Sequence, residues 1–201
     1  MASEVDICNL ALARLGDNAT VASIDPPEGS AQAEHCARFY AIARDSLLEM
    51  HAWKFATRRV QLAKLTVPSW DWSFAYAEPT GALKLLGVLS ATASNDDETQ
   101  PYEAESDANG AAIILTNQED ASLRFVARVT DTTKFSPLFV DALAWLLASY
   151  LAGPVLKGDA GAAMSKACLQ SFLLAFSNAK VSDANQRKVR PEHTPAWIAG
   201  R

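Results

Sequence analysis

The chain has little charge and few cysteines. Asp, Glu, Lys and Arg make up only 20% of its 201 residues, below the roughly 25% of an average soluble domain. So few charges indicate that part of the protein's surface is covered by partner molecules. The three cysteines Cys8, Cys36 and Cys168 stand far apart and form no C-x-x-C pair. This spacing argues against a disulfide framework and a zinc site, and it indicates a reducing compartment.

The sequence also lacks a long hydrophobic run and a basic leader. Its longest uncharged apolar stretch, 142–156, is shorter than the roughly 20 residues of a membrane span and contains Gly153-Pro154. We therefore expect a buried helix there and no membrane partner. The first four residues have neither the basic start nor the apolar run of a secretion signal.

Basic residues are missing from one region. No Lys or Arg occurs between Lys84 and Arg124, and the formal net charge of the whole chain is -5. This balance argues against a protein that binds nucleic acid by neutralising many phosphates. We interpret the region as a solvated loop with edge strands kept soluble by charge. Its acidic residues are Asp96, Asp97, Glu98, Glu103, Glu105, Asp107, Glu119 and Asp120.

Catalytic signatures are absent as well. There is no G-x-S-x-G, no H-E-x-x-H and no Walker loop, and His35, His51 and His193 lie in separate segments. We expect no catalytic, cofactor-binding or metal-binding residue and no cofactor. Five carboxylates are close enough in sequence for paired-carboxylate hydrolysis, namely Asp96, Asp97, Glu98, Glu103 and Glu105. A loop without apolar pocket residues would leave all of them solvated, so a carbohydrate hydrolase, to be tested at Glu103 or Glu105, is kept only as an alternative.

Capping residues predict two helices near the N-terminus. Ser3 and Asp6 have the spacing of a capping box, and Gly16 supplies a C-terminal stop. Ser30 caps a longer helix that should end near 51–53. A first, short helix and a second, long one therefore precede residue 57.

Two more helices are expected after residue 135. Ser136-Pro137 is a strong helix start, and the residues from Leu138 to Ala152 are apolar on nearly every side, which predicts a central helix. After Gly153-Pro154, Asp159 is expected to cap a last long helix. That helix has two apolar faces, one with Met164, Cys168, Phe172, Ala175 and Ala179 and the other with Leu169, Leu173 and Phe176. Two apolar faces imply two partners, its own bundle and a neighbouring subunit.

Between these helix pairs, short apolar runs broken by Pro, Gly, Asn and Asp indicate a β region. The pairing should be antiparallel, because no connection is long enough for a crossover helix. The expected strands are 57–65, 82–91, 100–104, 111–116 and 122–129.

Two aromatic segments flank the start of this region. Trp53 to Arg59 interleaves aromatic and basic residues, which suits nucleic acid, but the reading we favour is that Trp53 and Phe55 lock the junction between helix and sheet. The run from Trp70 to Tyr76 is interpreted as a packed or subunit-contacting loop, with Trp70 and Trp72 as its contacts.

The predicted fold class is therefore α+β. An antiparallel helical bundle of about four helices is interrupted by an antiparallel β-sheet insertion and followed by an extended C-terminal tail. We expect the helical bundle domain at 1–56 and 136–181, the β-sheet insertion domain at 57–135, and a docking tail at 182–201. The tail has too little apolar content to fold alone.

Several stretches of the chain carry a resemblance when they are taken in order: 7–12 with Leu15-Gly16, 36–40, Leu47-Leu48, Trp53 to Ala56, Leu62-Ala63, 72–79, 125–131 and 135–144. Together they resemble the tail tubular protein A family, the head-to-tail adaptors of short-tailed, podovirus-type bacteriophages. The resemblance spans nearly the whole chain, and the ordered set carries it, since each piece is a structural pattern and not a catalytic motif. After Pro79, where the family often has an acidic residue and a cysteine, this chain has Gly81-Ala82.

The resemblance implies a virion structural protein of the head-tail junction, present in the host cytoplasm during assembly. Its partners would be copies of itself in a ring with the portal's twelvefold symmetry, the portal protein, the tail nozzle protein, and genomic DNA that passes through the lumen without specific binding. No enzymatic turnover is expected. The alternatives are a tail-associated carbohydrate or cell-wall hydrolase and a nucleic-acid-binding module.

Two sets of residues are assigned to assembly. Trp197-Ile198 is an aromatic-aliphatic pair suited to an interface pocket, and basic residues surround it. The residues expected to dock on the portal are Arg187, Lys188, Arg190, Trp197, Ile198 and Arg201. The residues expected in subunit contacts are Trp70, Trp72, Leu169, Leu173 and Phe176.

Overall fold

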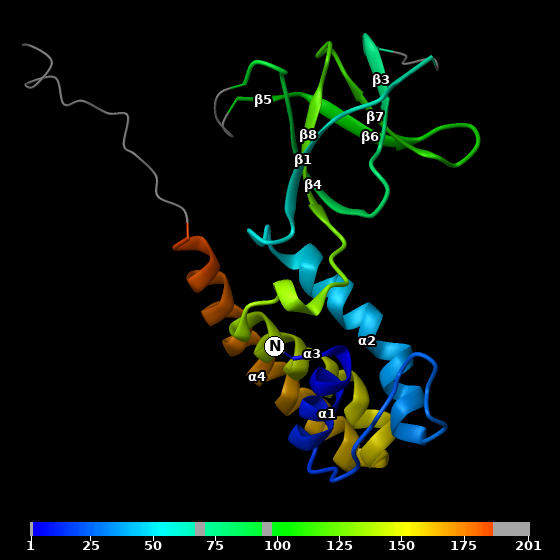
Figure 1. Cartoon of the computed structure of the whole chain (residues 1–201), viewed down its shortest axis with the longest axis vertical. Helices are drawn as coiled ribbons and strands as arrows, with labels where there is room; N and C mark the ends of the chain where they lie inside the picture. Colours follow the sequence, from blue (N-terminus) through cyan, green and yellow to red (C-terminus); the bar gives the residue numbers. More distant parts are fainter. Residues whose placement is uncertain (1, 67–70, 94–97, 187–201) are drawn as a thin grey trace, which may run out of the picture.

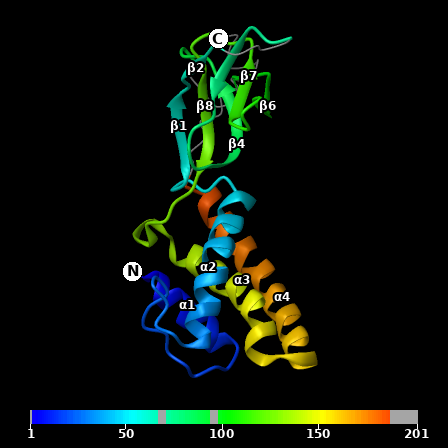
Figure 2. The ribbon, with the colours of Figure 1, turned by 90° about the vertical axis from the view of Figure 1, so that its right-hand side faces the viewer.

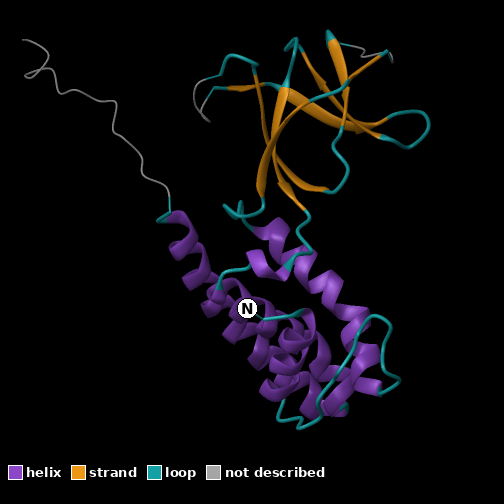
Figure 3. Cartoon of the chain, viewed as in Figure 1, coloured by secondary structure: helices purple, strands orange, loops and turns teal. Residues whose placement is uncertain are grey.

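The computed structural model describes residues 2–66, 71–93 and 98–186. Helices gather at one end of the molecule and strands at the other (Figures 1 and 3), which confirms the α+β class and the antiparallel pairing. The helices are α1 (Glu4–Arg14), α2 (Ala31–Met50), the short η1 (Thr132–Lys134), α3 (Pro137–Leu156) and α4 (Gly158–Ala184). The strands are β1 (Thr57–Gln61), β2 (Lys64–Leu65), β3 (Phe74–Ala77), β4 (Ala82–Leu89), β5 (Thr99–Gln100), β6 (Tyr102–Ser106), β7 (Ala112–Thr116) and β8 (Ser122–Ala127).

Serine side chains begin three of the helices, as predicted. The Ser3 hydroxyl accepts a hydrogen bond from the Asp6 N–H, and the Asp6 carboxylate accepts one from the Ser3 N–H at 2.8 Å, which completes the capping box of α1. Ser30 and Ser136 each accept a bond from the N–H three residues later, at the starts of α2 and α3. These bonds satisfy amide groups that have no partner within the helix.

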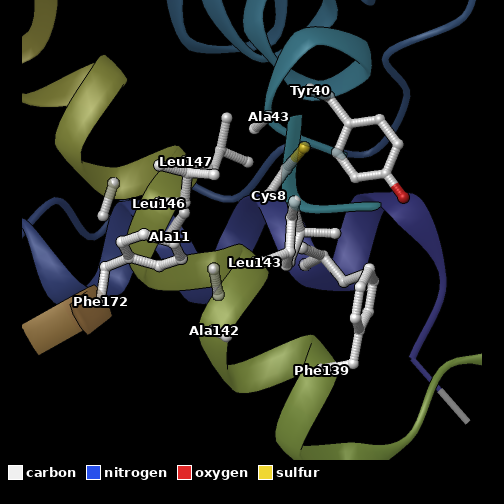
Figure 4. Packing of buried hydrophobic residues seen from close by; sticks show 14 of the residues in the cluster. Cys8, Ala11, Tyr40, Ala43, Phe139, Ala142, Leu143, Leu146, Leu147 and Phe172 are labelled. Carbon is white, nitrogen blue, oxygen red and sulfur yellow. The ribbon is translucent and has the colours of Figure 1, made fainter. Parts of the chain in front are cut away.

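Helix α3 is the centre of the bundle. It packs against α1, α2 and α4, and Figure 4 shows Phe139, Leu143 and Leu147 of this helix among the packed side chains of the core. Among the described helices it alone has the length and hydropathy needed to cross a membrane, and 56% of its most apolar window is buried inside the protein. Its buried residues are Phe139, Ala142, Leu143, Ala144, Leu146, Leu147, Ala148, Ser149, Leu151 and Ala152.

The turn between α3 and α4 differs from the prediction. We placed the boundary between the two helices at Gly153-Pro154, but α3 continues through Pro154 and ends at Leu156, so the backbone donor that proline lacks is lost only in the last turn. The expected cap by Asp159 is also wrong. Lys157, with φ 57°, holds the cap position of α4 without a side-chain hydrogen bond, and Asp159 lies in the first turn. There its charge favours the positive end of the helix.

Helices α3 and α4 approach each other closely after this turn. A Cβ atom on Gly161 would lie 2.9 Å from the carbonyl oxygen of Ala152 and 3.3 Å from the Cα of Gly153, so glycine is needed there. One turn further on, the Ser165 hydroxyl donates to the Ser149 carbonyl at 2.7 Å. The two antiparallel helices are therefore closely packed near the turn, and a side-chain hydrogen bond links them there.

The β region contains two four-stranded antiparallel sheets, where the sequence predicted one. The first has the order β1-β8-β4-β5 and the second β2-β3-β7-β6. The predicted strand 57–65 is divided between them as β1 and β2, and the predicted strand 100–104 falls mainly in β6, with β5 ending before Pro101. Each segment bends from one sheet to the other, as strands do at the corners of packed sheets. Strand β3 was not predicted, because we interpreted its aromatic run as a loop.

A small apolar core lies between the two sheets. Tyr76 and Ile114 of the second sheet pack with Val88, Leu123 and Phe125 of the first. All five side chains are at most 5% exposed. The β unit therefore has a core of its own.

The bundle and the β unit meet at the end of α2 (Figure 2). Leu83, Leu86 and Val126 from the first sheet pack against the core of the bundle, and Arg128 Nε lies 2.8 Å from a carboxylate oxygen of Asp45 on α2. Apolar contact and an ion pair therefore both join the two regions.

Aromatic rings fill the junction, as we expected of Trp53 and Phe55. Trp53 is 1% exposed, its Nε1 donates to the Leu47 carbonyl at 2.8 Å, and its ring meets Phe139 edge to face with centroids 5.0 Å apart. Phe55 contacts Phe135 and Phe139. The Trp53 and Phe55 rings therefore join the start of β1 to α3.

Candidate functional site

Helix α4 presents an apolar surface to solvent. Leu169, Leu173, Leu174 and Val181 are 44%, 57%, 68% and 59% exposed, and they form what we call the α4 outer face. In Figure 2, α4 lies at the side of the bundle away from α1. These are four of the nine large hydrophobic side chains that are exposed in the described part of the chain. The fold of the single chain does not explain why so many of them lie together on one helix.

The opposite side of α4 is committed to the bundle. Cys168, Phe172, Ala175 and Ala179 are buried, and Phe172 reaches the cluster beside α3 in Figure 4. The two apolar faces predicted for this helix are therefore present, one buried and one exposed. The predicted second face includes Leu169, Leu173 and Phe176 but omits Leu174 and Val181, which are also exposed. A full projection of the helix would have found both, since Leu174 and Val181 are seven residues apart and share one side.

Phe176 lies at the border of this surface. It is partly buried, with its ring centroid 5.5 Å from Phe172 and 6.1 Å from Trp53, and Lys180 Nζ lies 4.6 Å above the ring. Its own bundle therefore covers much of this side chain. The exposed leucines remain the larger surface available to another molecule.

Charge is sparse along α4. Between Asp159 and Asp183 its charged residues are Lys166 and Lys180. The α4 outer face therefore combines exposed aliphatic side chains with a weak positive charge, and no acidic residue lies between Asp159 and Asp183. Such a surface suits burial against another apolar surface.

A buried carboxylate fastens the end of α4 to the junction. Asp183 is 5% exposed, and it accepts a hydrogen bond from the Lys54 N–H at 3.0 Å while its other oxygen lies 3.1 Å from His51 Nε2. The His51 ring meets Trp53 edge to face at 4.8 Å. We call this contact the Asp183 clasp. It secures the last turn of the helix just before the chain's C-terminal residues.

The clasp corrects the predicted start of the tail. We expected the tail to begin at residue 182, but α4 extends to Ala184 and Asp183 is among its buried residues. The signal was present, because Asp183 continues the buried spacing of Ala175 and Ala179 by four residues. A buried carboxylate needs a hydrogen-bond partner, and the partners of Asp183 lie far away in the sequence. A local sequence pattern therefore cannot predict its burial.

The other residues assigned to assembly are elsewhere. Trp72 is partly buried against Ala75, Ile113 and Leu115 on the second sheet, and its Nε1 donates to a Glu103 carboxylate oxygen at 3.2 Å. It is therefore remote from the α4 outer face in the fold. Trp70, Arg187, Lys188, Arg190, Trp197, Ile198 and Arg201 lie outside the described residues.

The acidic residues considered for hydrolysis are exposed. Glu103 and Glu105 lie on β6, at one edge of the second sheet, opposite Leu115 and Ile113 of β7. Residues two apart on a strand share one side of the sheet, so both carboxylates face the same way. Burial that would tune one of them as a general acid is absent at both positions.

The described residues offer little other reactive chemistry. No group of three or more His, Cys, Asp or Glu among them is arranged to hold a metal ion. The three cysteines are buried, and burial raises the pKa of the Cys168 thiol above its ordinary value. A protonated, buried thiol is a poor nucleophile.

Comparison with known proteins gives no further assignment. No protein-family model matches the chain, and no curated protein is similar to it at a significant level.

Proposed function

We propose that the chain is a subunit of the head-to-tail adaptor ring of a short-tailed bacteriophage. In this role it is a structural protein that sits between the portal and the tail nozzle. Subunits contact one another through the α4 outer face, and the C-terminal residues dock on the portal. The proposal combines the family resemblance of the sequence with one structural observation, the exposed aliphatic surface of α4.

That surface supports assembly on energetic grounds. Burial of apolar surface contributes about 25 cal/mol per Å² of area removed from water. Leu173 and Leu174 are each more than half exposed, although the other side of their helix is fully used in the bundle. Leucine side chains that stay in water add no burial energy to the stability of the monomer. Contact with a second subunit would bury them, which explains why they are exposed in the single chain.

A closed ring needs two different surfaces on each subunit, because neighbours meet head to tail. The second surface we propose is on α2, where Ile42 and Met50 are 54% and 48% exposed. Helix α3 packs against both α2 and α4. The α4 outer face of one subunit would then meet the exposed side of α2 on the next.

The charge of the chain suits a passage for DNA. The net charge is -5, and the acidic residues Glu103 and Glu105 are exposed. An acidic lumen repels phosphates and keeps the duplex from sticking as it passes. The basic residues assigned to docking, among them Arg187 and Arg190, are suited to an acidic portal surface.

The test measures ring formation with and without the portal. We expect the purified protein to be a monomer or weak oligomer at micromolar concentration and to form rings on portal particles of the same phage, because each subunit contact is small until a template supplies symmetry. Light scattering and electron microscopy of the mixture give the readout. A stable closed ring without portal would contradict the templating step, and a portal that recruits no protein would contradict the adaptor role.

Substitutions then assign the contact. Leu173→Asp combined with Leu174→Asp should abolish rings while leaving the monomer folded, because both side chains are exposed. Leu138→Asp is the matched control, since Leu138 is 40% exposed near the start of α3 and lies off the α4 outer face. Rings formed equally by both variants would show that α4 is not the contact. A further chain ending at residue 186 tests docking, and its normal attachment to the portal would exclude the C-terminal residues as the dock.

A further inference from the structure

The second sheet of the β unit ends in an open edge. Strand β6 pairs with β7 on one side and with no described strand on the other. All residues from Glu103 to Ser106 are exposed. Neither the α4 outer face nor the Asp183 clasp includes residues of this strand, so the edge is a surface that the contacts described above leave unused.

The hydrogen bonds of the β6–β7 hairpin show which backbone groups face the open side. The Asp107 N–H donates to the Ala111 carbonyl at 2.8 Å, so these opposite residues form a hydrogen-bonded pair. Such pairs alternate along an antiparallel ladder, and the register of β6 on β7 has no shift. The odd-numbered residues of β6 therefore bond to β7. The even-numbered residues, which are Tyr102, Ala104 and Ser106, turn their N–H and C=O groups away from it.

These outward-facing backbone groups form no hydrogen bond with another described residue. A row of unpaired donors and acceptors along a strand is a template for an added strand from another polypeptide. Backbone bonds would hold such a strand in place, and the side chains of β6 would decide which strand fits.

The side chains beside this template are acidic. Glu103 and Glu105 stand two apart on β6 and therefore share one side of the sheet. Glu103 accepts a hydrogen bond from Trp72 Nε1 at 3.2 Å, whereas Glu105 has no hydrogen bond or ion pair with a described residue. Like charges on paired strands repel, so two copies of β6 would not pair with each other. The edge selects a strand with basic residues at alternate positions.

The sequence contains one segment with this pattern. Among the 18 lysines and arginines, Lys188 and Arg190 are the only two that stand two positions apart. The segment Lys188-Val189-Arg190 thus repeats the spacing of Glu103-Ala104-Glu105 with the opposite charge. In an antiparallel pairing of the two middle residues, each basic side chain lies directly opposite a carboxylate, at the positions where side chains of paired strands are closest.

The segment cannot reach the edge of its own chain. Helix α4 ends beside the junction, where the Asp183 clasp holds it, and the strands that meet α2 there belong to the first sheet. Figure 1 shows β6 across the β unit from the end of α4. Packed sheets lie about 10 Å apart, farther than the roughly 7 Å that the two residues from Gln186 to Lys188 can span. The strand must come from a second copy of the chain.

We propose that residues 187–190 of one copy bind the β6 edge of another copy as an added strand. This contact rests on the proposed ring, which keeps copies side by side and raises the effective concentration of the segment at its neighbour's edge. It refines the role of the tail, because Lys188 and Arg190 then bind a neighbouring subunit while Trp197 and Ile198 remain for the portal.

The experiment is an NMR titration of the full chain, at micromolar concentration, with a capped peptide of residues 186–191. The matched probe is the same peptide with Lys188→Gln and Arg190→Gln. We expect saturable shifts at Ala104 and Ser106 with the basic peptide, with a dissociation constant on the order of 1 mM for so short a strand. The glutamine peptide should bind at least about tenfold more weakly, because its bonds to the carboxylates lose their charge. Equal binding of the two peptides, or no saturation by the basic peptide, overturns the proposal.

Variants of the full chain separate strand addition from charge attraction. Ala104→Pro removes an outward N–H and blocks the edge while the bonds between β6 and β7 stay, so it should abolish peptide binding with little change in melting temperature. Glu105→Gln should weaken binding by about tenfold. The matched control is Glu119→Gln, in the exposed turn between β7 and β8, which should bind as the unaltered chain does. Unchanged binding by Glu105→Gln, or by a folded Ala104→Pro protein, overturns the proposal.

The peptide titration and the portal test give separate answers. Peptide binding at β6 by a protein that no portal recruits would support the edge contact and contradict the adaptor role. Rings that form on the portal with a chain that binds no peptide would contradict the edge contact and leave the adaptor role intact.

Discussion

Two neighbouring helices, α3 and α4, both contain many apolar residues but bury them to different extents. Helix α3 is covered by α1, α2 and α4, and its leucines from Leu143 to Leu151 are buried in the core. Helix α4 packs on α3 with one side and leaves Leu173 and Leu174 in water with the other. Packing within one chain therefore explains why most of α3 is apolar. It explains the apolar residues on the buried side of α4 but not those on its exposed side. The unexplained half is where we place the contact with another subunit.

The largest expected effect is the loss of a leucine from α3. Leu143 is fully buried, so Leu143→Ala should lower the free energy of unfolding by about 3 kcal/mol through lost burial and a residual cavity. Leu174→Ala on the α4 outer face should change it by less than about 0.5 kcal/mol. Urea denaturation of the monomer measures both. Equal costs would mean that the chain itself buries the α4 outer face.

The close approach of the two helices gives the next effect. Gly161→Ala should cost about 2 kcal/mol, because the added methyl group meets the Ala152 carbonyl at 2.9 Å and forces the helices apart. Gly153→Ala is the matched control, since a Cβ there meets no atom within 4 Å. In a helix that replacement should be neutral or stabilising. A Gly161→Ala protein as stable as the control would show that the α3–α4 turn relaxes without cost.

A smaller effect is expected at the far end of α4. Asp183→Asn keeps an oxygen for the Lys54 N–H but loses the charged contact with His51, at a cost of about 1 kcal/mol. Amide hydrogen exchange should then quicken in the last turn of α4 and leave the α3 core unchanged. A double-mutant cycle with His51→Ala tests the pairing. Full additivity of the two substitutions would mean that the clasp has no coupling energy.

The smallest effect is a gain in stability. Lys157 has φ 57° and ψ 163° between α3 and α4, a conformation that glycine adopts far more readily than other residues. Lys157→Gly should therefore raise the free energy of unfolding by about 0.5 to 1 kcal/mol, measured by thermal denaturation. A loss of stability would show that the lysine side chain makes a contact worth more than the backbone strain.

The features predicted correctly from the sequence are local ones. The Ser3–Asp6 capping box, the caps at Ser30 and Ser136, and the burial of α3 each depend on residues within a few positions of one another. Such patterns can be recognised in the sequence alone, because the interacting residues are close together in the chain. The exposure of Leu173 was predicted on the same basis.

The features that were missed depend on distant partners. Strand β3 is short, and its place in the second sheet is set by pairing with β7, about forty residues later. The bend at Pro101 separates β5 from β6 only because two sheets exist to receive them. Asp183 is buried because His51 and Lys54 meet it from the other side of the junction.

The pairing of Thr57 with Val126 has a consequence for the architecture as a whole. The chain enters the β unit and leaves it on neighbouring antiparallel strands, so the two crossing points are separated by only about 5 Å. A short turn would bridge that gap, and α1, α2, α3 and α4 would keep their order along the chain without residues 58–125. The β unit is thus an insertion between α2 and α3. Its length or sequence can change without altering the order in which the helices of the bundle are connected.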